Sequence, residues 1–269
     1  MKFLLMTTSI LSEKAIKELE RLFNSIEESE NRLEKIKHIV LLQNFTEEYQ
    51  FFIEKHSRLI DFMTFDSKMS LSKARNLMLA KARKEGTLTN VDIIAYPDDD
   101  CWYTKSFLEY ISSIFASKNN LDFLFCKYSS KPVDALDSNK PKKAKITDLI
   151  KNASSNTIFV RSNIAINAGG FDESLGVGTP NNGGEDLDYA IKLFLSSRST
   201  EFIDNELVGH RDKILELKEK YFQGSHIALR KHAFKKPTLF YQWFRKLIVG
   251  IVLIIKGDMN ITKLMKAKY

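Results

Sequence analysis

Three adjacent carboxylates at residues 98–100 follow an apolar stretch of the chain, residues 91–96. The stretch is mostly β-branched, aromatic or small, which is typical of a strand buried on both faces, and its apolar pattern stops at Pro97. In open α/β sheets, ligands bind beyond the carboxyl ends of the strands. Adjacent carboxylates repel one another unless a cation offsets their charge, and oxygen ligands favour Mg²⁺ or Mn²⁺. The pattern indicates a ligand or metal site, although a polar turn before a helix near Thr104 explains the same residues.

Glu185 and Asp186 form a second acidic pair, directly after Gly183 and Gly184. The two glycines allow the backbone to approach a ligand closely. Both carboxylates fall in the first turn of an expected helix, where the helix dipole favours negative charge. Capping of that helix by acidic residues is the alternative explanation. The helix is indicated by apolar residues at helical spacing, namely Leu187, Ala190, Ile191, Phe194 and Leu195.

Strands and helices alternate along the chain around these acidic segments. Apolar runs indicate strands at residues 3–8, 38–42, 59–65, 91–96, 121–128, 157–160 and 201–208. Helical spacing indicates a helix that follows Ser12 and further helices at residues 46–56, 70–82, 107–115 and 185–195. Such alternation predicts an α/β fold in which helices cover both faces of a mostly parallel sheet.

The composition limits the classes of protein. A chain of 269 residues with 43% hydrophobic content is long enough to bury one large core or two modest ones. Cys101 and Cys126 lack the spacing of a metal site and are too few for a disulfide framework, which indicates a reducing compartment. Residues 1–8 lack a cleavage site and predict a first strand in place of a signal peptide. The sequence contains no Walker-type phosphate loop, no GxGxxG, no zinc pattern and no internal repeat.

The basic charge lies in the C-terminal part of the chain. Residues 211–269 contain 14 Lys or Arg and 4 Asp or Glu, a net charge of +10, so the whole-chain value of +7 leaves −3 for residues 1–210. After Pro237, apolar residues fall on one helical face, but the uninterrupted run 247–255 has only nine residues, whereas a spanning helix needs about 20. We therefore predict a helix that lies on an anionic membrane surface; the alternative is a terminal helix packed on the core or on a partner. The face consists of Phe240, Trp243, Phe244, Leu247, Ile248, Ile251, Val252 and Ile255.

A basic tail with interleaved aromatic residues also suggests nucleic acid as a partner. However, the apolar content of residues 239–255 exceeds what an exposed nucleic-acid surface needs, and residues 1–210 are slightly acidic. We therefore expect no nucleic-acid partner.

Four motifs, in this order, resemble the GT-A-fold glycosyltransferases, most closely the family 2 enzymes that build bacterial surface polysaccharides such as capsule, O-antigen or lipopolysaccharide. The motifs are LSKARN at residues 71–76, DDD at 98–100, GGFDE at 169–173 with GGED at 183–186, and His210. The resemblance covers residues 1–232 and implies that they form a GT-A catalytic domain, with residues 233–269 as a basic amphipathic helical tail.

The resemblance implies a hexosyltransferase that uses a nucleotide-diphospho-sugar donor, with UDP-sugar favoured. The expected acceptor is a hydroxyl of a glycan or a lipid-linked glycan, and the expected place is the cytoplasm, at the inner face of the plasma membrane. The alternative is a GT-A-like domain without activity that serves as a partner in a polysaccharide assembly complex.

The resemblance also implies roles for residues on the donor side. Asp98 is expected near the nucleotide ribose, and Asp100 on the cation, Mn²⁺ or Mg²⁺, that bridges the diphosphate and neutralises the leaving group. Asp99 is either a nucleotide contact or a spacer. Arg75 and Asn76 are expected against the donor, because a guanidinium fork suits phosphate, although a solvated helix face also explains them.

On the acceptor side, the resemblance implies that Asp186 is the general base of an inverting displacement, with Glu185 beside it in the same motif. Asp188 is a weaker candidate for the base. His210 holds the place of a C-terminal metal ligand of the family. Thr8 and the pair Gln43-Asn44, at the ends of the first two strands, stand where the family contacts the nucleotide base, but the family more often has Asp at the position of Asn44.

Overall fold

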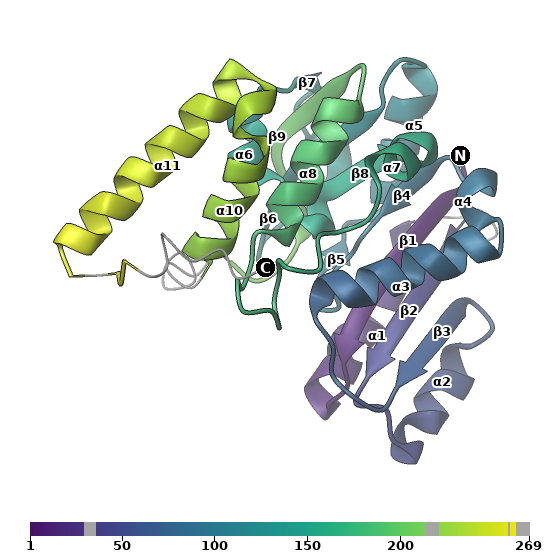
Figure 1. Ribbon diagram of the computed structural model, residues 1–269. Coiled ribbons are helices and arrows are strands. Elements are labelled where there is room, and N and C mark those ends of the chain that lie inside the picture. The colour runs from purple at the N-terminus through teal and green to yellow at the C-terminus, as the bar shows by residue number, and fades with distance from the viewer. Residues whose placement is uncertain (30–35, 213–220, 258, 262–269) are drawn as a thin grey trace.

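The computed structural model describes residues 1–29, 36–212, 221–257 and 259–261. Within these residues a single nine-stranded sheet has the order β3-β2-β1-β4-β8-β6-β9-β5, and β7 pairs with β9 (Figure 1). The strands are β1 (Phe3–Ile10), β2 (Ile36–Gln43), β3 (Ile60–Phe65), β4 (Ile93–Ala95), β5 (Trp102–Tyr103), β6 (Phe123–Ser129), β7 (Lys142–Lys143), β8 (Ile158–Arg161) and β9 (Thr200–Gly209).

Six strands, namely β1 to β4, β6 and β9, run in one direction, which confirms the predicted mostly parallel α/β sheet. The expectation of a parallel strand is wrong for β8, which runs antiparallel to both of its neighbours, β4 and β6. An apolar run has the same side-chain alternation in either direction, so the pattern at residues 157–160 predicts a strand but not its direction.

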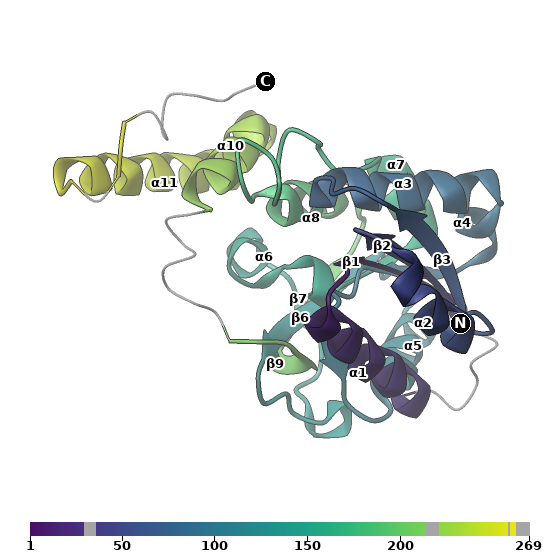
Figure 2. The same cartoon turned by 90° about the horizontal axis from the view of Figure 1, so that it is seen from below.

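Helices cover both faces of the sheet (Figure 2). One face packs against α1 (Glu13–Ser29), α2 (Gln50–His56) and α5 (Phe107–Ser117). The other face packs against α3 (Leu71–Lys84), α4 (Thr87–Asn90), α6 (Ile146–Asn152), α7 (Ser162–Ala168) and α8 (Glu185–Ser196). Two further helices lie outside α8 and α6, where α10 contacts α8 and α11 contacts α6, and their bounds are α10 (Phe222–His232) and α11 (Pro237–Ile255).

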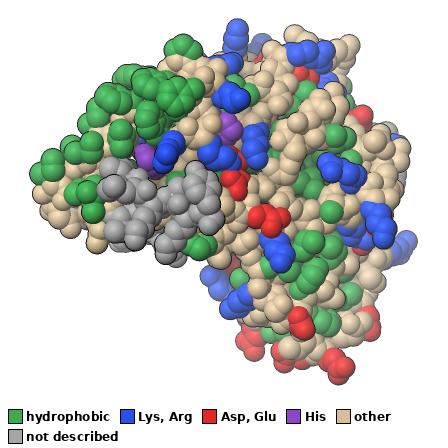
Figure 3. Space-filling model, in the orientation of Figure 1, with side chains coloured by type: hydrophobic (Ala, Val, Ile, Leu, Met, Phe, Trp, Pro, Cys, Tyr) green, Lys and Arg blue, Asp and Glu red, His purple; other side chains and the backbone are tan. Residues whose placement is uncertain are grey.

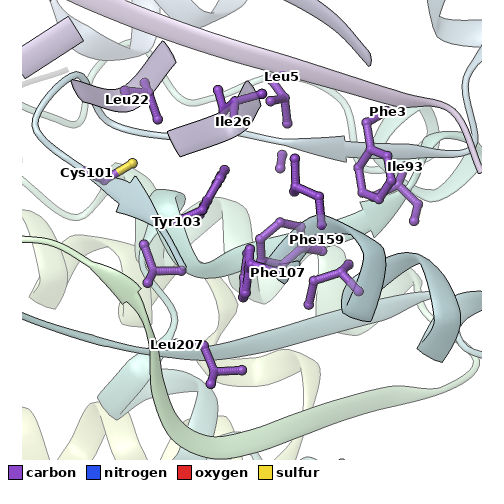
Figure 4. Close-up of a cluster of buried hydrophobic side chains, with 14 of the residues drawn as sticks. Phe3, Leu5, Leu22, Ile26, Ile93, Cys101, Tyr103, Phe107, Phe159 and Leu207 are labelled. Carbon is purple, nitrogen blue, oxygen red and sulfur yellow. The ribbon is translucent and has the colours of Figure 1, made fainter. Parts of the chain in front are cut away.

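The core follows from the two-residue period of the strands. In β1, Phe3 and Leu5 belong to the apolar cluster beneath α1 and α5, whereas Leu4 and Met6 belong to the cluster beneath α3 and α8. Figure 4 shows the first cluster, in which side chains from β1, α1, α5 and β8 meet. Because both faces are buried, the central strands are fixed in position, and the loops at their carboxyl ends start from a rigid platform.

Two serine caps fix the starts of the helices nearest these loops. The Ser12 hydroxyl accepts a hydrogen bond from the Ala15 N–H at 3.1 Å, and the Ser70 hydroxyl accepts one from the Lys73 N–H at 3.4 Å. The helix starts predicted at both serines are confirmed. The caps place the N-terminal turns of α1 and α3 beside the carboxyl ends of β1 and β2.

The helical part of the tail is longer than its uninterrupted apolar run. α11 has 19 residues, about 28 Å at 1.5 Å per residue, and its only charged residues are Arg245 and Lys246. In the described part of the chain it is the one helix long and apolar enough to cross a membrane, by length and composition. The estimate from residues 247–255 was therefore too short, because two cations interrupt the apolar run without ending the helix.

Candidate active site

A cleft of about 790 Å³ lies at the carboxyl ends of β1, β2, β6 and β9, and the loop that follows β4 forms part of its wall. This is the edge of the sheet where the sequence predicted a ligand site. Asn44 and Asn76 are not among the residues that line the cleft. The predicted site residues that do line it are Thr8, Arg75, Asp98, Asp99, Asp100, Glu185, Asp186 and His210.

Asp98, Asp100 and His210 form a cluster in which one ligand atom from each lies within 4.8 Å of the others. Nε2 of His210 lies 2.9 Å from Oδ1 of Asp100 and 3.8 Å from Oδ2 of Asp98. Burial, opposed by Arg75, raises the pKa of Asp98, and repulsion from Asp186 adds to the rise. A divalent cation between the two carboxylates and the imidazole would offset this cost, and the donor set suits Mn²⁺.

The second nitrogen of His210 has a partner that suits a metal ligand. Nδ1 lies 2.9 Å from the carbonyl oxygen of Arg211, so a proton on Nδ1 leaves Nε2 free to coordinate. The His210 N–H donates to the Ser129 carbonyl at 2.9 Å, and the ring packs edge-on against Tyr128 with centroids 4.8 Å apart. The residues present therefore fit a divalent cation.

The pairing of β5 with β9 brings the two halves of this cluster together. Trp102, two residues after Asp100, pairs with Gly209, the residue before His210. The Arg21 guanidinium lies 4.1 Å from the centroid of the Trp102 ring and donates to the carbonyl oxygen of Asp100 at 2.6 Å. Arg21 in α1 thus supports the Asp100 backbone and the tryptophan at the same time.

Arg75 lies at the centre of the site, and its side chain is 2% exposed. Its Nη1 donates to Oδ1 of Asp186 at 2.7 Å, while its Nη2 donates to the Ser155 hydroxyl at 2.7 Å and to Oδ1 of Asp98 at 3.2 Å. Burial acts to lower the pKa of Arg75, but the two carboxylates raise it above its ordinary value, so the guanidinium stays charged. Arg75 lines the cleft, and N–H groups of its guanidinium are hydrogen-bonded to these partners. A contact between Arg75 and a nucleotide-sugar molecule stays a prediction.

Asp186 and Glu185 have different electrostatic surroundings. Burial acts to raise the pKa of Asp186, but Arg75 and the Ser155 N–H, 3.1 Å from Oδ2, hold it below its ordinary value. Burial, together with repulsion from Asp186, raises the pKa of Glu185 to about 7. The Asp186 side chain is 25% exposed and lines the cleft. It is an ionised carboxylate in a fixed orientation, next to a space that a hydroxyl group can enter.

The backbone before this pair fits closely against α10. Gly184 has φ of 85°, a left-handed conformation, and a Cβ at this position would lie 2.3 Å from the carbonyl carbon of Gly224. A Cβ on Gly183 would lie 2.8 Å from the ring of Tyr221. The sequence predicted that these glycines let the backbone approach a ligand, and both of them line the cleft. They also admit the close approach of Tyr221 and α10, which fixes the start of α8.

The ends of β1 and β2 form a polar corner of the cleft. The Gln43 amide donates to the Thr8 hydroxyl at 3.1 Å and accepts from the Met69 N–H at 2.7 Å. Gln43 lines the cleft, whereas Asn44, with φ of 55°, forms the turn that follows the strand. Of the predicted pair Gln43-Asn44, it is therefore Gln43 that lines the cleft, and a contact of either residue with the nucleotide base stays a prediction.

Asp99 is directed to a different partner from that of its neighbours. It accepts a hydrogen bond from the Ser9 hydroxyl at the end of β1. Burial, opposed by this hydrogen bond, raises the pKa of Asp99 to about 6. Asp99 lies outside the cluster of Asp98, Asp100 and His210, and its contact with the nucleotide stays a prediction beside the alternative of a spacer or helix cap.

Asn76 binds the loop that contains the second glycine motif. Its Nδ2 donates to the Phe171 carbonyl at 3.0 Å and to Glu173 at 2.9 Å, and its Oδ1 accepts from the Phe171 N–H at 2.8 Å. Asn76, in the motif at residues 71–76, thus supports the backbone of the motif at residues 169–173. A direct contact of Asn76 with the donor stays a prediction.

Asp188 lies apart from the cleft and is fully buried. Its Oδ1 lies 2.9 Å from Nε2 of His232 and 2.9 Å from Nζ of Lys231, both in α10, and its Oδ2 lies 3.0 Å from Nζ of Lys192. These contacts connect α8 with α10. Asp188 is therefore placed to hold the two helices together.

Several cleft residues were not predicted from the sequence. Ser155 bonds Arg75, Asp98 and Asp186, yet it comes from a polar connection without any chemical motif. Arg211 Nη1 lies 3.2 Å from Oδ2 of Asp100, and the only signal for it is its position directly after His210. The others are Ser9 and Tyr128.

No protein-family model matches the chain, and no curated protein matches it. Among solved structures, S. aureus TarS 1–349 in complex with UDP-GlcNAc matches with a TM-score of 0.65 and 17% identity, over 87% of this chain and 67% of that one. A longer S. aureus TarS structure matches with a TM-score of 0.65 and 16% identity, over 87% of this chain and 40% of that one. GalNAc-T7 with UDP, GalNAc and Mn²⁺ matches with a TM-score of 0.58 and 11% identity, over 85% of this chain and 47% of that one.

At these identities the likeness establishes the fold. The curled, mostly parallel sheet, its flanking helices and the order of its elements are those of the glycosyltransferase structures that it matches. The chain therefore has the GT-A fold that the four motifs predicted.

Proposed function

We propose that this protein is a glycosyltransferase that moves a sugar from a nucleotide-diphospho-sugar to a hydroxyl acceptor. The observation that carries the proposal is the position of Asp98, whose two oxygens face different halves of the cleft. Oδ1 accepts a hydrogen bond from Arg75, while Oδ2 faces His210. A cluster suited to a cation and a buried carboxylate pair suited to proton transfer thus meet at the carboxyl edge of a GT-A sheet.

The diphosphate of the donor is assigned to the part of the cleft beside Asp100 and His210. Bound Mn²⁺ or Mg²⁺ would neutralise charge on the leaving nucleoside diphosphate at this place. Arg211, whose side chain is 63% exposed beside Asp100, adds a guanidinium that suits phosphate. A UDP-sugar is favoured, because the matched TarS structure holds UDP-GlcNAc and the matched GalNAc-T7 structure holds UDP.

The nucleoside is assigned to the polar corner between β1 and the start of α3. Thr8 and Gln43 present side-chain polar atoms there, and Asp99 follows on the side of the acidic loop. Asn44 forms the turn that directly follows this corner, and Asn76 supports the loop of residues 169–173.

Asp186 is assigned the role of general base. The acceptor hydroxyl would give its proton to the Asp186 carboxylate while its oxygen attacks the anomeric carbon opposite the leaving diphosphate, which inverts the configuration. Arg75 and Ser155 orient the carboxylate for this step. Glu185, whose pKa is raised to about 7, is the alternative proton acceptor.

The acceptor is assigned to the class of glycans or lipid-linked glycans of bacterial surface polysaccharides. Support comes from the order of the motifs and from the open cleft, which extends to Tyr221 and Ser225 in α10. The cytoplasm is the proposed compartment, since both cysteines are free and buried in this structure.

The test combines a panel of nucleotide sugars with two carboxamide variants. A UDP-sugar is expected to raise the melting temperature of the protein and to be hydrolysed slowly when Mn²⁺ is present. Asp186→Asn is expected to keep that thermal shift while transfer and hydrolysis fall about 10²–10⁴-fold. Asp137→Asn, a change at an exposed carboxylate far from the cleft, is the matched control.

Two outcomes would contradict the proposal. If no nucleotide sugar binds with Mn²⁺ present, the donor assignment is wrong. If a donor binds but is neither hydrolysed nor transferred by the unmodified protein, the chain is an inactive GT-A-like partner. Unchanged turnover in Asp186→Asn would move the base to Glu185, which Glu185→Gln tests in the same assay.

A further inference from the structure

The side of α11 that faces away from the body is an exposed apolar surface. We call it the outer face of α11, and its residues recur at spacings of three and four along the helix. Figure 3 shows the cluster of hydrophobic side chains over this helix. The outer face consists of Tyr241, Phe244, Ile248, Ile251, Val252 and Ile255, with exposed fractions from 42% to 79%.

The opposite side of α11 is held by the body of the protein. Leu239, Gln242 and Gly250 are buried, and Nζ of Lys246 lies 4.6 Å from the centroid of the Phe222 ring in α10. These contacts fix the rotation of the helix about its axis. Because the opposite side of α11 is packed on the body, the outer face points into solvent, and no described residue covers it.

The described residues of the segment 221–257, which forms α10 and α11, carry charges of one sign. Residues 221–257 contain seven Lys or Arg and no Asp or Glu. Two copies of the chain that met through this face would bring these cations together, which disfavours a second copy as the occupant. An anionic surface with an apolar interior matches both the charge and the exposed side chains.

The centre of α11 argues against a helix that crosses the membrane. Arg245 and Lys246 lie at the midpoint of the 19 residues, where a spanning helix would place them in the middle of the hydrocarbon. A spanning helix would also lose the contacts of Leu239 and Gln242 with the body. A helix that lies in the plane of the interface keeps these contacts and leaves Arg245 at the edge of the apolar face, near the headgroups.

We propose that the outer face of α11 docks on an anionic lipid bilayer and lies in its interface. Apolar burial of the aromatic and aliphatic side chains supplies one part of the attraction. Lys235, Lys236 and Lys256, exposed at the two ends of the helix, supply the other part by contact with anionic headgroups. The two parts differ in their response to salt, because only the second is screened.

The experiment is flotation of the full chain with vesicles of phosphatidylcholine alone and of phosphatidylcholine with phosphatidylglycerol. We expect binding to the anionic vesicles at least tenfold stronger than to the neutral ones, and weaker but still measurable binding in 0.5 M NaCl. Phe244→Glu combined with Ile248→Glu should abolish flotation. Phe51→Glu, which changes an even more exposed aromatic residue in α2, should leave it intact. Thermal melts of both variants establish that they are folded.

Each other occupant of the outer face gives a distinct result. Absence of flotation by the unmodified chain overturns the proposal, as does equal flotation of the Phe244→Glu, Ile248→Glu variant. A dimer in size-exclusion chromatography that the same variant dissociates, without vesicle binding, would identify a second copy as the occupant. Resistance to extraction at alkaline pH would show a spanning helix in place of an interfacial one. Donor hydrolysis is measured separately, so failure here leaves the proposed function untouched.

Discussion

The ring of Trp102 lies against the backbone of Gly209 so closely that a Cβ on the glycine would come 2.1 Å from the indole. Trp102 follows the acidic loop by two residues, and Gly209 immediately precedes His210. The contact therefore sets how near the Asp100 carboxylate and the His210 imidazole approach each other. Metal ligands depend on such supporting contacts, whose loss typically lowers metal affinity about 10–100-fold.

Loss of this support should weaken metal binding. Arg21→Gln removes the guanidinium that lies on Trp102 and bonds the Asp100 carbonyl, so we expect the Kd for Mn²⁺ alone to rise about tenfold. Isothermal titration of Mn²⁺ into the protein measures it. Arg58→Gln, at an exposed arginine in the loop between α2 and β3, is the matched control. Gly209→Ala should raise the Kd further, because the added Cβ collides with the Trp102 ring. An unchanged Kd for Mn²⁺ in both variants would show that the contacts of Arg21, Trp102 and Gly209 have no influence on Asp100 and His210.

Removal of the charge at Arg75 should destabilise the fold. Arg75→Met leaves the carboxylates of Asp98 and Asp186 without their shared partner in a buried site, which typically costs about 3–5 kcal/mol. Urea unfolding of the variant measures the loss. A second change, Asp186→Asn, should restore part of it, because one of the two unpaired charges is then absent. Losses that simply add in the double variant would contradict a direct coupling between the two residues.

Substitution of Asp188 should mainly lower the stability of the fold, whereas substitution of Asp186 should mainly lower the turnover. Asp188→Asn breaks a buried carboxylate contact with His232 and Lys231 of α10, so we expect a lower free energy of unfolding with little change in turnover per folded molecule. Asp186→Asn should show the loss of turnover. The comparison uses urea unfolding and donor hydrolysis on both variants. A large fall in turnover for folded Asp188→Asn would assign it a part in the chemistry.

The buried His38 should make the fold sensitive to mild acid. Burial lowers the pKa of His38 to about 3, whereas the unfolded chain titrates near 6.5. Between these values the unfolded state binds a proton that the folded state does not, so stability is greatest above pH 6.5 and falls as the pH falls. From pH 6.5 to pH 5 this group alone should remove about 2 kcal/mol.

Urea unfolding at both pH values tests this prediction, with His38→Gln as the comparison. The variant should lose less stability than the unmodified chain over this interval, because its side chain does not titrate. His226, whose pKa burial lowers to about 4, contributes in the same direction and is present in both proteins. Equal losses in the two proteins would show that His38 does not determine the acid response.

The fold could be predicted where the information is local. The strand and helix periods, and the caps at Ser12 and Ser70, each depend on residues within a few positions of one another. The direction of β8 could not be predicted, because it depends on how the 28 residues numbered 130–157, between β6 and β8, are folded. Short elements such as β5 and β7 exist only through their pairing with β9 and leave no pattern of their own.

The candidate site shows the same division. The acidic motifs stand at the ends of readable elements, and the role of His210 was implied by the order of the motifs in the resembling family. The sequence places Gln43 and Asn44 together at the end of β2, and only the structure shows that Gln43 lines the cleft whereas Asn44 does not, because in a strand one residue reverses the direction of the side chain. The contacts of Ser155 with Arg75 and Asp186 join segments distant in sequence, and no local pattern encodes them.

The buried guanidinium of Arg75 has a consequence for how the chain matures during its synthesis. Its closest carboxylate partner, Asp186, follows 111 residues later. A ribosome that adds about 5–20 residues per second needs roughly 6–22 s to reach it. During that interval β1 to β4 can assemble around α1 and α3, with Asp98 as the only carboxylate near Arg75. The ion pairs of the cleft are thus completed late in translation. In a nascent chain arrested before residue 186, the Arg75 guanidinium has only one of its two carboxylate partners.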